Sequence, residues 1–116
     1  MRNYQNEKLP EGAEYVGSSP LMTERDVLKA ILEAHMAPKG KCGYLIVEKG
    51  KLQFVWEDTE EVFDAAPGHP IVIGSERYHH IRITGRVVFR DEFYKVPDTG
   101  VYENDARRPA EEFLKH

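Results

Sequence analysis

Gly43-Tyr-Leu-Ile-Val-Glu-Lys-Gly-Lys-Leu-Gln-Phe-Val-Trp56 is the stretch of sequence that decides the predicted fold. Tyr44–Val47 and Leu52–Trp56 are apolar runs rich in β-branched and aromatic residues, which favour strands. The residues between them, Glu48–Lys51, are polar and include a glycine, as hairpin turns often do. The pattern therefore predicts two antiparallel strands joined by a tight turn.

A second hairpin is predicted nearer the end of the chain. Tyr78–Thr84 and Arg86–Val96 are again rich in β-branched and aromatic residues, and Gly85 separates them. Short strands are expected at Val62–Asp64 and Ile71–Ile73, between polar or Pro-Gly turns. Many short strands at close spacing predict an all-β fold, an antiparallel sandwich or barrel.

The segment 24–35 is ambiguous between helix and strand. Thr23 can cap a helix there, and the apolar residues that follow recur at helical spacing. The same residues can also form a short turn followed by a strand from about Lys29 to Met36. The residues alone leave both alternatives open.

The two ends of the chain are less regular. Prolines and glycines interrupt residues 10–20, which predicts an irregular N-terminal arm or an edge strand. The residues that follow Pro97 are polar and charged, and 108–115 form either a short helix or a frayed end. We therefore expect one domain with its N-terminal arm at 1–97 and a polar C-terminal tail at 98–116.

Composition limits the classes of partner. The 116 residues suffice for one domain, and the net charge of −4 comes from intermixed acids and bases, so nucleic acid is not an expected partner. No apolar run approaches the roughly 20 residues that cross a bilayer, and the N-terminus lacks the apolar core of a signal peptide, so we expect a cytoplasmic protein without a membrane partner. The single cysteine, Cys42, excludes an internal disulfide.

Five segments, in their order and spacing, resemble the cupin superfamily, and more narrowly the small cupin-like domain of tellurite-resistance (TehB-like) proteins. The segments are Leu9–Glu14, His35–Gly40, Tyr44–Leu52, Gly74–His80 and Phe89–Tyr94. The resemblance implies a single-domain cupin-like β-barrel or jelly roll. It favours strand over helix for 24–35, because the stretch that ends at His35 is a strand in such domains. It also implies a homodimer, since small cupins pair sheet faces or exchange N-terminal strands.

The resemblance also implies where a metal ion would be bound. Counted back from Gly50, the ligand positions of the first cupin motif fall near Ala37, Lys39 and Gly43, so the usual histidines and glutamate are absent. The histidine of the second motif corresponds to His79. Because three or four converging ligands hold iron, zinc or manganese in a cupin, a metal site cannot be carried over whole.

Strand parity predicts a replacement for the missing ligands. His35 has the parity of the absent ligand positions, and His79 would face the interior from the other side, so these histidines can meet across the barrel mouth. His80 would point the opposite way. With Glu92, by the family pattern, they form a tentative two-histidine, one-carboxylate set for a divalent transition metal such as Fe, Zn or Mn. Parity leaves open whether Asp91 or Glu92 faces the interior.

Two functions follow as alternatives. In the first, the barrel binds a small polar molecule or oxyanion in a tellurite or stress response, with His79, His80, Arg77 and Tyr78 as hydrogen-bond donors. In the second, the protein is a metal-dependent enzyme of the dioxygenase or isomerase sort, with His35 and His79 as ligands. The missing ligands of the first motif favour the binding function, and the sequence does not decide whether turnover occurs.

Overall fold

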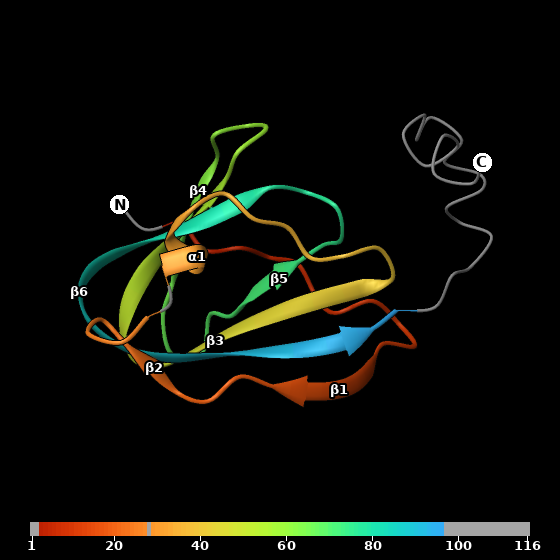
Figure 1. Ribbon diagram of the computed structural model, residues 1–116, viewed down its shortest axis with the longest axis horizontal. Coiled ribbons are helices and arrows are strands. Elements are labelled where there is room, and N and C mark those ends of the chain that lie inside the picture. The colour runs from red at the N-terminus through yellow and green to blue at the C-terminus, as the bar shows by residue number, and fades with distance from the viewer. Residues whose placement is uncertain (1–2, 28, 97–116) are drawn as a thin grey trace.

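The computed structural model of the chain describes residues 3–27 and 29–96. This part is a six-stranded antiparallel β-sheet with one turn of helix, as Figure 1 shows. The predicted all-β, antiparallel fold is therefore confirmed. The tail expected at 98–116, with the helix expected at 108–115, lies outside the described residues.

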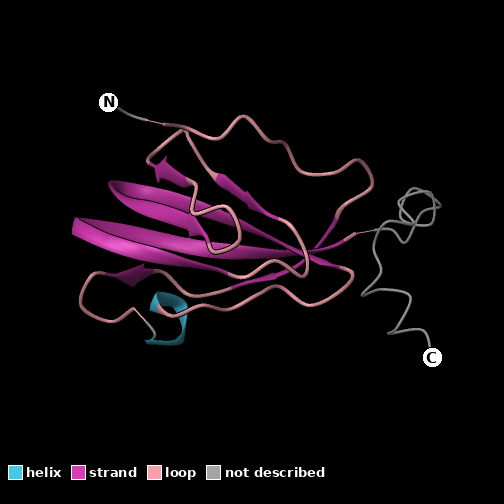
Figure 2. Cartoon of the chain, turned by 90° about the horizontal axis from the view of Figure 1, so that it is seen from above, coloured by secondary structure: helices cyan, strands magenta, loops and turns pink. Residues whose placement is uncertain are grey.

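Two long strands form the centre of the sheet, β3 (Lys41–Trp56) and β6 (His79–Lys95). They pair antiparallel along their whole lengths, from Lys41 opposite Lys95 to Trp56 opposite His79. Figure 2 shows them side by side as long, curved strands. Together they form one two-stranded ribbon, which we call the β3–β6 ribbon.

Both predicted hairpins are therefore wrong. The chain does not reverse at Glu48–Lys51 or at Thr84–Gly85, because each expected pair of strands is one continuous strand. The β3–β6 register shifts on both sides of Gly50, which marks β-bulges, and Gly50 has a φ of 76°. Bulges bend a strand and increase its twist, so residues with the chemistry of a turn produce a bend here.

Four short strands extend the ribbon on its two sides. β1 (Glu14–Ser18) and β2 (Met22–Thr23) pair with β6, whereas β4 (Val62–Ala65) and β5 (Ile71–Ile73) pair with β3. The expected N-terminal edge strand and the two expected short strands are confirmed. β1 and β2 pair with β6 of the same chain, and the homodimer, through paired sheet faces or exchanged N-terminal strands, stays a prediction.

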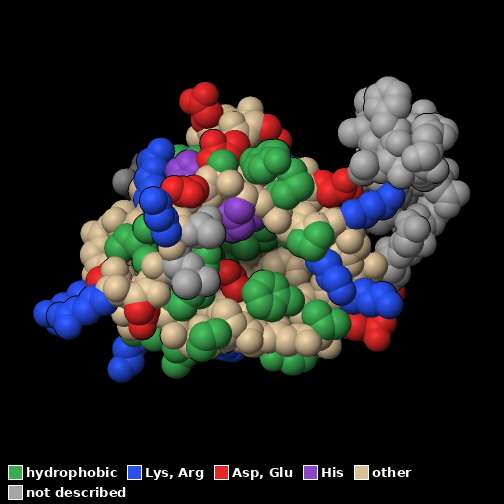
Figure 3. All heavy atoms as spheres, viewed as in Figure 1, with side chains coloured by type: hydrophobic (Ala, Val, Ile, Leu, Met, Phe, Trp, Pro, Cys, Tyr) green, Lys and Arg blue, Asp and Glu red, His purple; other side chains and the backbone are tan. Residues whose placement is uncertain are grey.

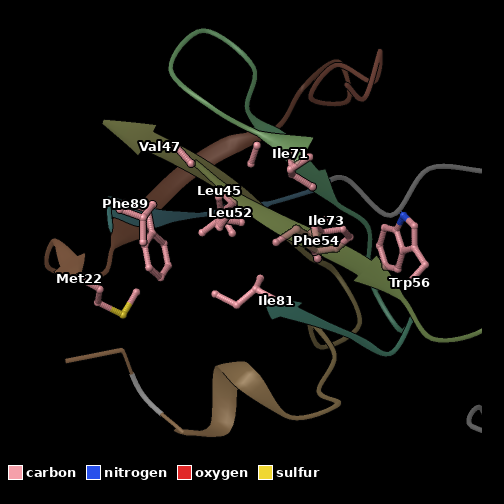
Figure 4. Close-up of a cluster of buried hydrophobic side chains, with 12 residues drawn as sticks. Met22, Leu45, Val47, Leu52, Phe54, Trp56, Ile71, Ile73, Ile81 and Phe89 are labelled. Carbon is pink, nitrogen blue, oxygen red and sulfur yellow. The ribbon is translucent and has the colours of Figure 1, made fainter. Parts of the chain in front are cut away.

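The bend brings both halves of the ribbon around one hydrophobic core. In β3, odd-numbered residues such as Leu45 face the core before Gly50, and even-numbered residues such as Phe54 face it afterwards. The bulges cause this change, because an extra residue in one strand shifts the alternation of its side chains by one position. Figure 4 shows the buried cluster, which consists of Met22, Leu45, Val47, Leu52, Phe54, Trp56, Ala65, Ile71, Ile73, Ile81, Val87 and Phe89.

The segment 24–35 contains a helical turn. α1 (Lys29–Leu32) lets Ile31 pack against the core, and the chain is extended only after it, where His35 pairs with His79. The prediction of a strand that starts at Lys29 is therefore wrong for its first residues, which form a helical turn as the spacing of their apolar residues indicates. No helix among the described residues is long and apolar enough to cross a membrane.

Candidate functional site

A pocket of about 420 Å³ lies where the two ends of the bent β3–β6 ribbon come together. Five of its lining residues carry titratable groups: His35, Lys41, Cys42, His79 and Asp91. Figure 3 shows histidine side chains next to hydrophobic ones on one face of the molecule. Most of the remaining wall is apolar and includes Val16, Met36, Ala37, Pro38, Ile73 and Phe93.

The two histidines of the pocket lie against each other. The backbone N–H of each donates to the carbonyl of the other, at 2.9 Å from His35 and 2.8 Å from His79. Their ring centroids are 4.1 Å apart, and the ring of His79 also stacks on Phe54 at 5.0 Å. The structure thus brings together the two histidines that strand parity predicted to meet across the barrel mouth.

Hydrogen bonds identify the protonated nitrogen of each neutral ring. Nδ1 of His35 lies 2.9 Å from the carbonyl oxygen of Glu33, and Nδ1 of His79 lies 3.2 Å from that of Arg77. Because a carbonyl oxygen only accepts, both Nδ1 atoms must carry the hydrogen. The Nε2 atom of each neutral ring then carries a lone pair and is a hydrogen-bond acceptor.

Asp91 is the carboxylate of the pocket. It lies on the same face of β6 as Phe89 and Phe93, and its Oδ1 atom is buried without a hydrogen-bond partner among the described residues. Burial raises the pKa of Asp91 from 3.8 to about 6. An unpaired buried acceptor of this kind is rare in folded proteins, because it loses its hydration without compensation.

Glu92 lies on the other face of β6. It accepts a hydrogen bond from the Tyr94 hydroxyl at 2.8 Å and one from the Arg90 guanidinium at 3.3 Å. The structure therefore resolves the alternative that parity left open, since Asp91 and not Glu92 lines the pocket. Glu92 is separated from the two histidines with which it was grouped.

The described residues do not fit the metal site that the resemblance implies. A transition metal needs its nitrogen and oxygen ligands about 2.0 to 2.2 Å away, converging on one point. No group of three or more His, Cys, Asp or Glu side chains in 3–27 and 29–96 meets that requirement. The set of His35, His79 and Glu92 is not assembled, because Glu92 faces away from the pocket.

The other three residues expected to bind a ligand also lie outside the pocket. His80 points away from His79, as parity predicted, and pairs with Glu57. Arg77 makes two hydrogen bonds to Asp58, at 3.0 and 2.8 Å, and its guanidinium lies 3.8 Å from the Trp56 ring centroid.

Tyr78, the third residue outside the pocket, has a side chain that is 55% exposed. Of the four residues expected to bind a ligand, His79 is therefore the one that lines the pocket. Its metal partner in the tentative set, His35, also lines the pocket.

Sequence reasoning did not select several residues of the pocket, above all Asp91. A signal for it exists, because buried side chains of β6 recur at odd positions from His79 through Ile81 and Val87 to Phe89, and Asp91 continues that series. Lys41, at the rim, gives no comparable signal, since a lysine at the start of a strand is most often a solvated residue.

His79 and Asp91, two of the titratable side chains of the pocket, change the stability of the fold with pH in opposite directions. Burial, and secondarily the charge of His35, lowers the pKa of His79 from 6.5 to about 4. The stability that neutral His79 contributes is therefore complete above pH 6.5 and is lost as the pH falls towards 4. Asp91 destabilises the fold above pH 6, and this penalty disappears as the pH falls from 6 to 3.8.

Asp91→Asn is therefore expected to be more stable than the wild type at pH 7, by up to about 3 kcal/mol, since the pKa of Asp91 is raised from 3.8 to about 6 and each pKa unit corresponds to about 1.4 kcal/mol. The variant should also lose stability on acidification from pH 6.5 to 4, where the opposing effect of Asp91 masks that of His79 in the wild type. Urea unfolding at a series of pH values measures both. Equal stability of the two proteins at pH 7 would contradict the burial of an unpaired carboxylate.

Comparison with known proteins places the fold but not the function. No protein-family model matches the chain, and no curated protein matches it. A solved structure of a protein from Escherichia coli strain K12 has a TM-score of 0.69 at 21% identity, over 78% of this chain and 98% of that one. TehB from Haemophilus influenzae has a TM-score of 0.63 at 21% identity, over 72% of this chain and 32% of its own.

At these identities the similarity shows a shared fold. The match spans about a third of the TehB chain. Structural neighbours thus include a TehB protein, as the resemblance implied, whereas the cupin assignment stays a prediction.

Proposed function

We propose that the protein binds a small organic molecule in the pocket beside His35 and His79. The observation that carries this proposal is the composition of the pocket, which joins mostly apolar walls to a few polar groups in about 420 Å³. Ligand sites in proteins commonly have this size and composition. The apolar walls supply affinity through burial of the ligand, and the polar groups select its chemistry.

This proposal keeps the binding function expected from the sequence and changes its ligand. An oxyanion needs donors, and two of the expected ones are engaged elsewhere, Arg77 with Asp58 and His80 with Glu57. Inside the pocket, an oxyanion would meet the carboxylate of Asp91, which repels it above pH 6. An uncharged or cationic organic molecule meets neither obstacle.

The alternative of a metal-dependent enzyme has no support of this kind. It requires a third ligand beside His35 and His79, and the described residues supply none that meets metal geometry. The role in tellurite stress stays a prediction drawn from the resemblance, because the match to TehB spans a third of that chain.

Ala37→Trp tests the proposal by filling the pocket. Ala37 lines it, whereas Ala34 lies in the same segment, is exposed and does not line it, so Ala34→Trp is the matched control. Neutral aromatic and alkyl fragments are titrated into the labelled protein, and amide chemical shifts are followed. We expect shifts at Gly43 and Phe93, lost or weakened at least about tenfold in Ala37→Trp and kept in Ala34→Trp.

Shifts scattered over other parts of the surface, or equal affinity in both variants, would reject this pocket as the binding site. The melting temperature of each variant shows whether the added ring fits without unfolding the protein. A variant with Met36→Trp fills the same pocket from a neighbouring position and serves if Ala37→Trp does not fold.

A further inference from the structure

Three of the polar side chains that line the pocket, those of Asp91, His35 and His79, can accept hydrogen bonds. Asp91 offers carboxylate oxygens, one of them buried and unpartnered among the described residues. The Nδ1 atoms of His35 and His79 donate to backbone carbonyls, so in a neutral ring it is the Nε2 atom that holds the lone pair. His79 stays neutral at pH 7 because burial lowers its pKa to about 4.

Donors are scarce in the same pocket. The thiol of Cys42 donates to the carbonyl of Gly43 at 3.5 Å, and burial raises the pKa of Cys42, which keeps it uncharged. The ammonium of Lys41 belongs to an exposed residue at the rim. A ligand inside the pocket therefore meets acceptors, and it must supply the donors itself.

The negative charge of Asp91 further limits the chemical class of the ligand. The Asp91 carboxylate has no cationic partner among the described residues, and buried charges in proteins are normally paired. A metal ion does not fit, since no three ligands converge. An alcohol would supply one donor and leave the charge unpaired, whereas an ammonium group supplies three donors and the missing positive charge.

We propose, on the basis of the function proposed above, that the ligand is a small primary amine with an apolar body. Its ammonium group donates to Asp91 and to Nε2 of the histidine pair, and its body packs against the apolar wall that includes Val16, Met36 and Phe93. Such a group contacts its acceptors at about 2.8 Å, a longer distance than the roughly 2.0 to 2.2 Å that a metal ion requires.

Three compounds of nearly equal shape test the amine. Titration calorimetry at pH 7.5 compares 2-phenylethylamine, 2-phenylethanol and phenylacetate on the full chain. We expect the amine to bind at least about tenfold more tightly than the alcohol, since charge-assisted hydrogen bonds are about twice as strong as neutral ones, and phenylacetate to bind more weakly than either.

Two variants locate the amine contact. Asp91→Asn keeps the shape of the side chain and removes its charge, so the preference for the amine over the alcohol should disappear. Glu92→Gln removes one carboxylate from the opposite face of the same strand and should keep the preference. In the wild type, affinity for the amine should fall below pH 6, where Asp91 becomes protonated.

The outcomes separate this inference from the function on which it rests. Equal or tighter binding of the alcohol or of phenylacetate would overturn the amine and keep the pocket as a binding site. An unchanged preference in Asp91→Asn, or one lost in Glu92→Gln alone, would also overturn it. If none of the three compounds binds, and neutral fragments fail as well, both proposals are wrong.

Discussion

Gly50→Ala is expected to lose more than about 4 kcal/mol of stability, which is a large part of the roughly 5 to 15 kcal/mol that stabilise a typical protein. A Cβ atom at position 50 would lie 2.0 Å from the carbonyl oxygen of Arg86, and 3.0 Å from the Cα of Val87. Both are backbone atoms of the facing strand, so they cannot move aside as a flexible side chain would. The φ of 76° adds the strain of a left-handed conformation.

Gly85→Ala is the matched control for this prediction. Gly85 lies on the facing strand near the same bend, and a Cβ atom there meets nothing within 4 Å. We expect it to change stability by less than about 1 kcal/mol. Thermal and urea unfolding of the two variants measure the contrast. Similar stability of Gly50→Ala and Gly85→Ala would contradict the close approach of β3 and β6 at the bend.

Phe54→Ala is expected to lose about 3 to 5 kcal/mol, because it removes a fully buried aromatic ring and leaves a cavity. Phe54 also lies 5.0 Å from the ring of His79 and 4.8 Å from that of Trp56. Water that enters the cavity would hydrate His79, whose pKa is low mainly because of burial. The pKa of His79 should therefore rise from about 4 towards 6.5.

Phe93→Ala carries the same substitution at a position that is 44% exposed, and it should lose less than about 1 kcal/mol. Urea unfolding compares the stabilities, and a pH titration of the histidine ring resonances gives the pKa of His79. If Phe54→Ala leaves that pKa near 4, the low value does not come from the packing around His79.

The sequence predicts the fold class and the short strands correctly, but it predicts a hairpin where each of the two long strands is continuous. Glu48–Lys51 and Thr84–Gly85 have the chemistry of hairpin turns, and local chemistry alone cannot show whether a polar, glycine-containing segment reverses a chain or bends it. The difference depends on partners far along the chain. Here β3 pairs with β6 along its whole length, and this pairing keeps both strands continuous.

The expected hairpin also leaves open the choice between Asp91 and Glu92 as the inward acid. Parity predicts that His35 and His79 meet across the barrel mouth, because the direction of each follows from its own short segment. Asp91 shares that face only if β6 is one strand, since a hairpin at Thr84–Gly85 would interrupt the count of alternating residues from His79. With the strand continuous, the odd positions predict Asp91 as the inward acid.

The length of the β3–β6 ribbon also determines which of its residue pairs form at the lowest entropic cost during folding. Closing a loop loses more chain entropy as the loop lengthens, so Trp56 opposite His79 is the least costly pair and Lys41 opposite Lys95 the most costly. The pocket takes His79 from the first end and Gly43 and Phe93 from the second. The pocket is complete only when β3 and β6 are paired along their whole lengths. Local unpairing that begins at the Lys41 end would open the pocket while the core around the bend stays folded.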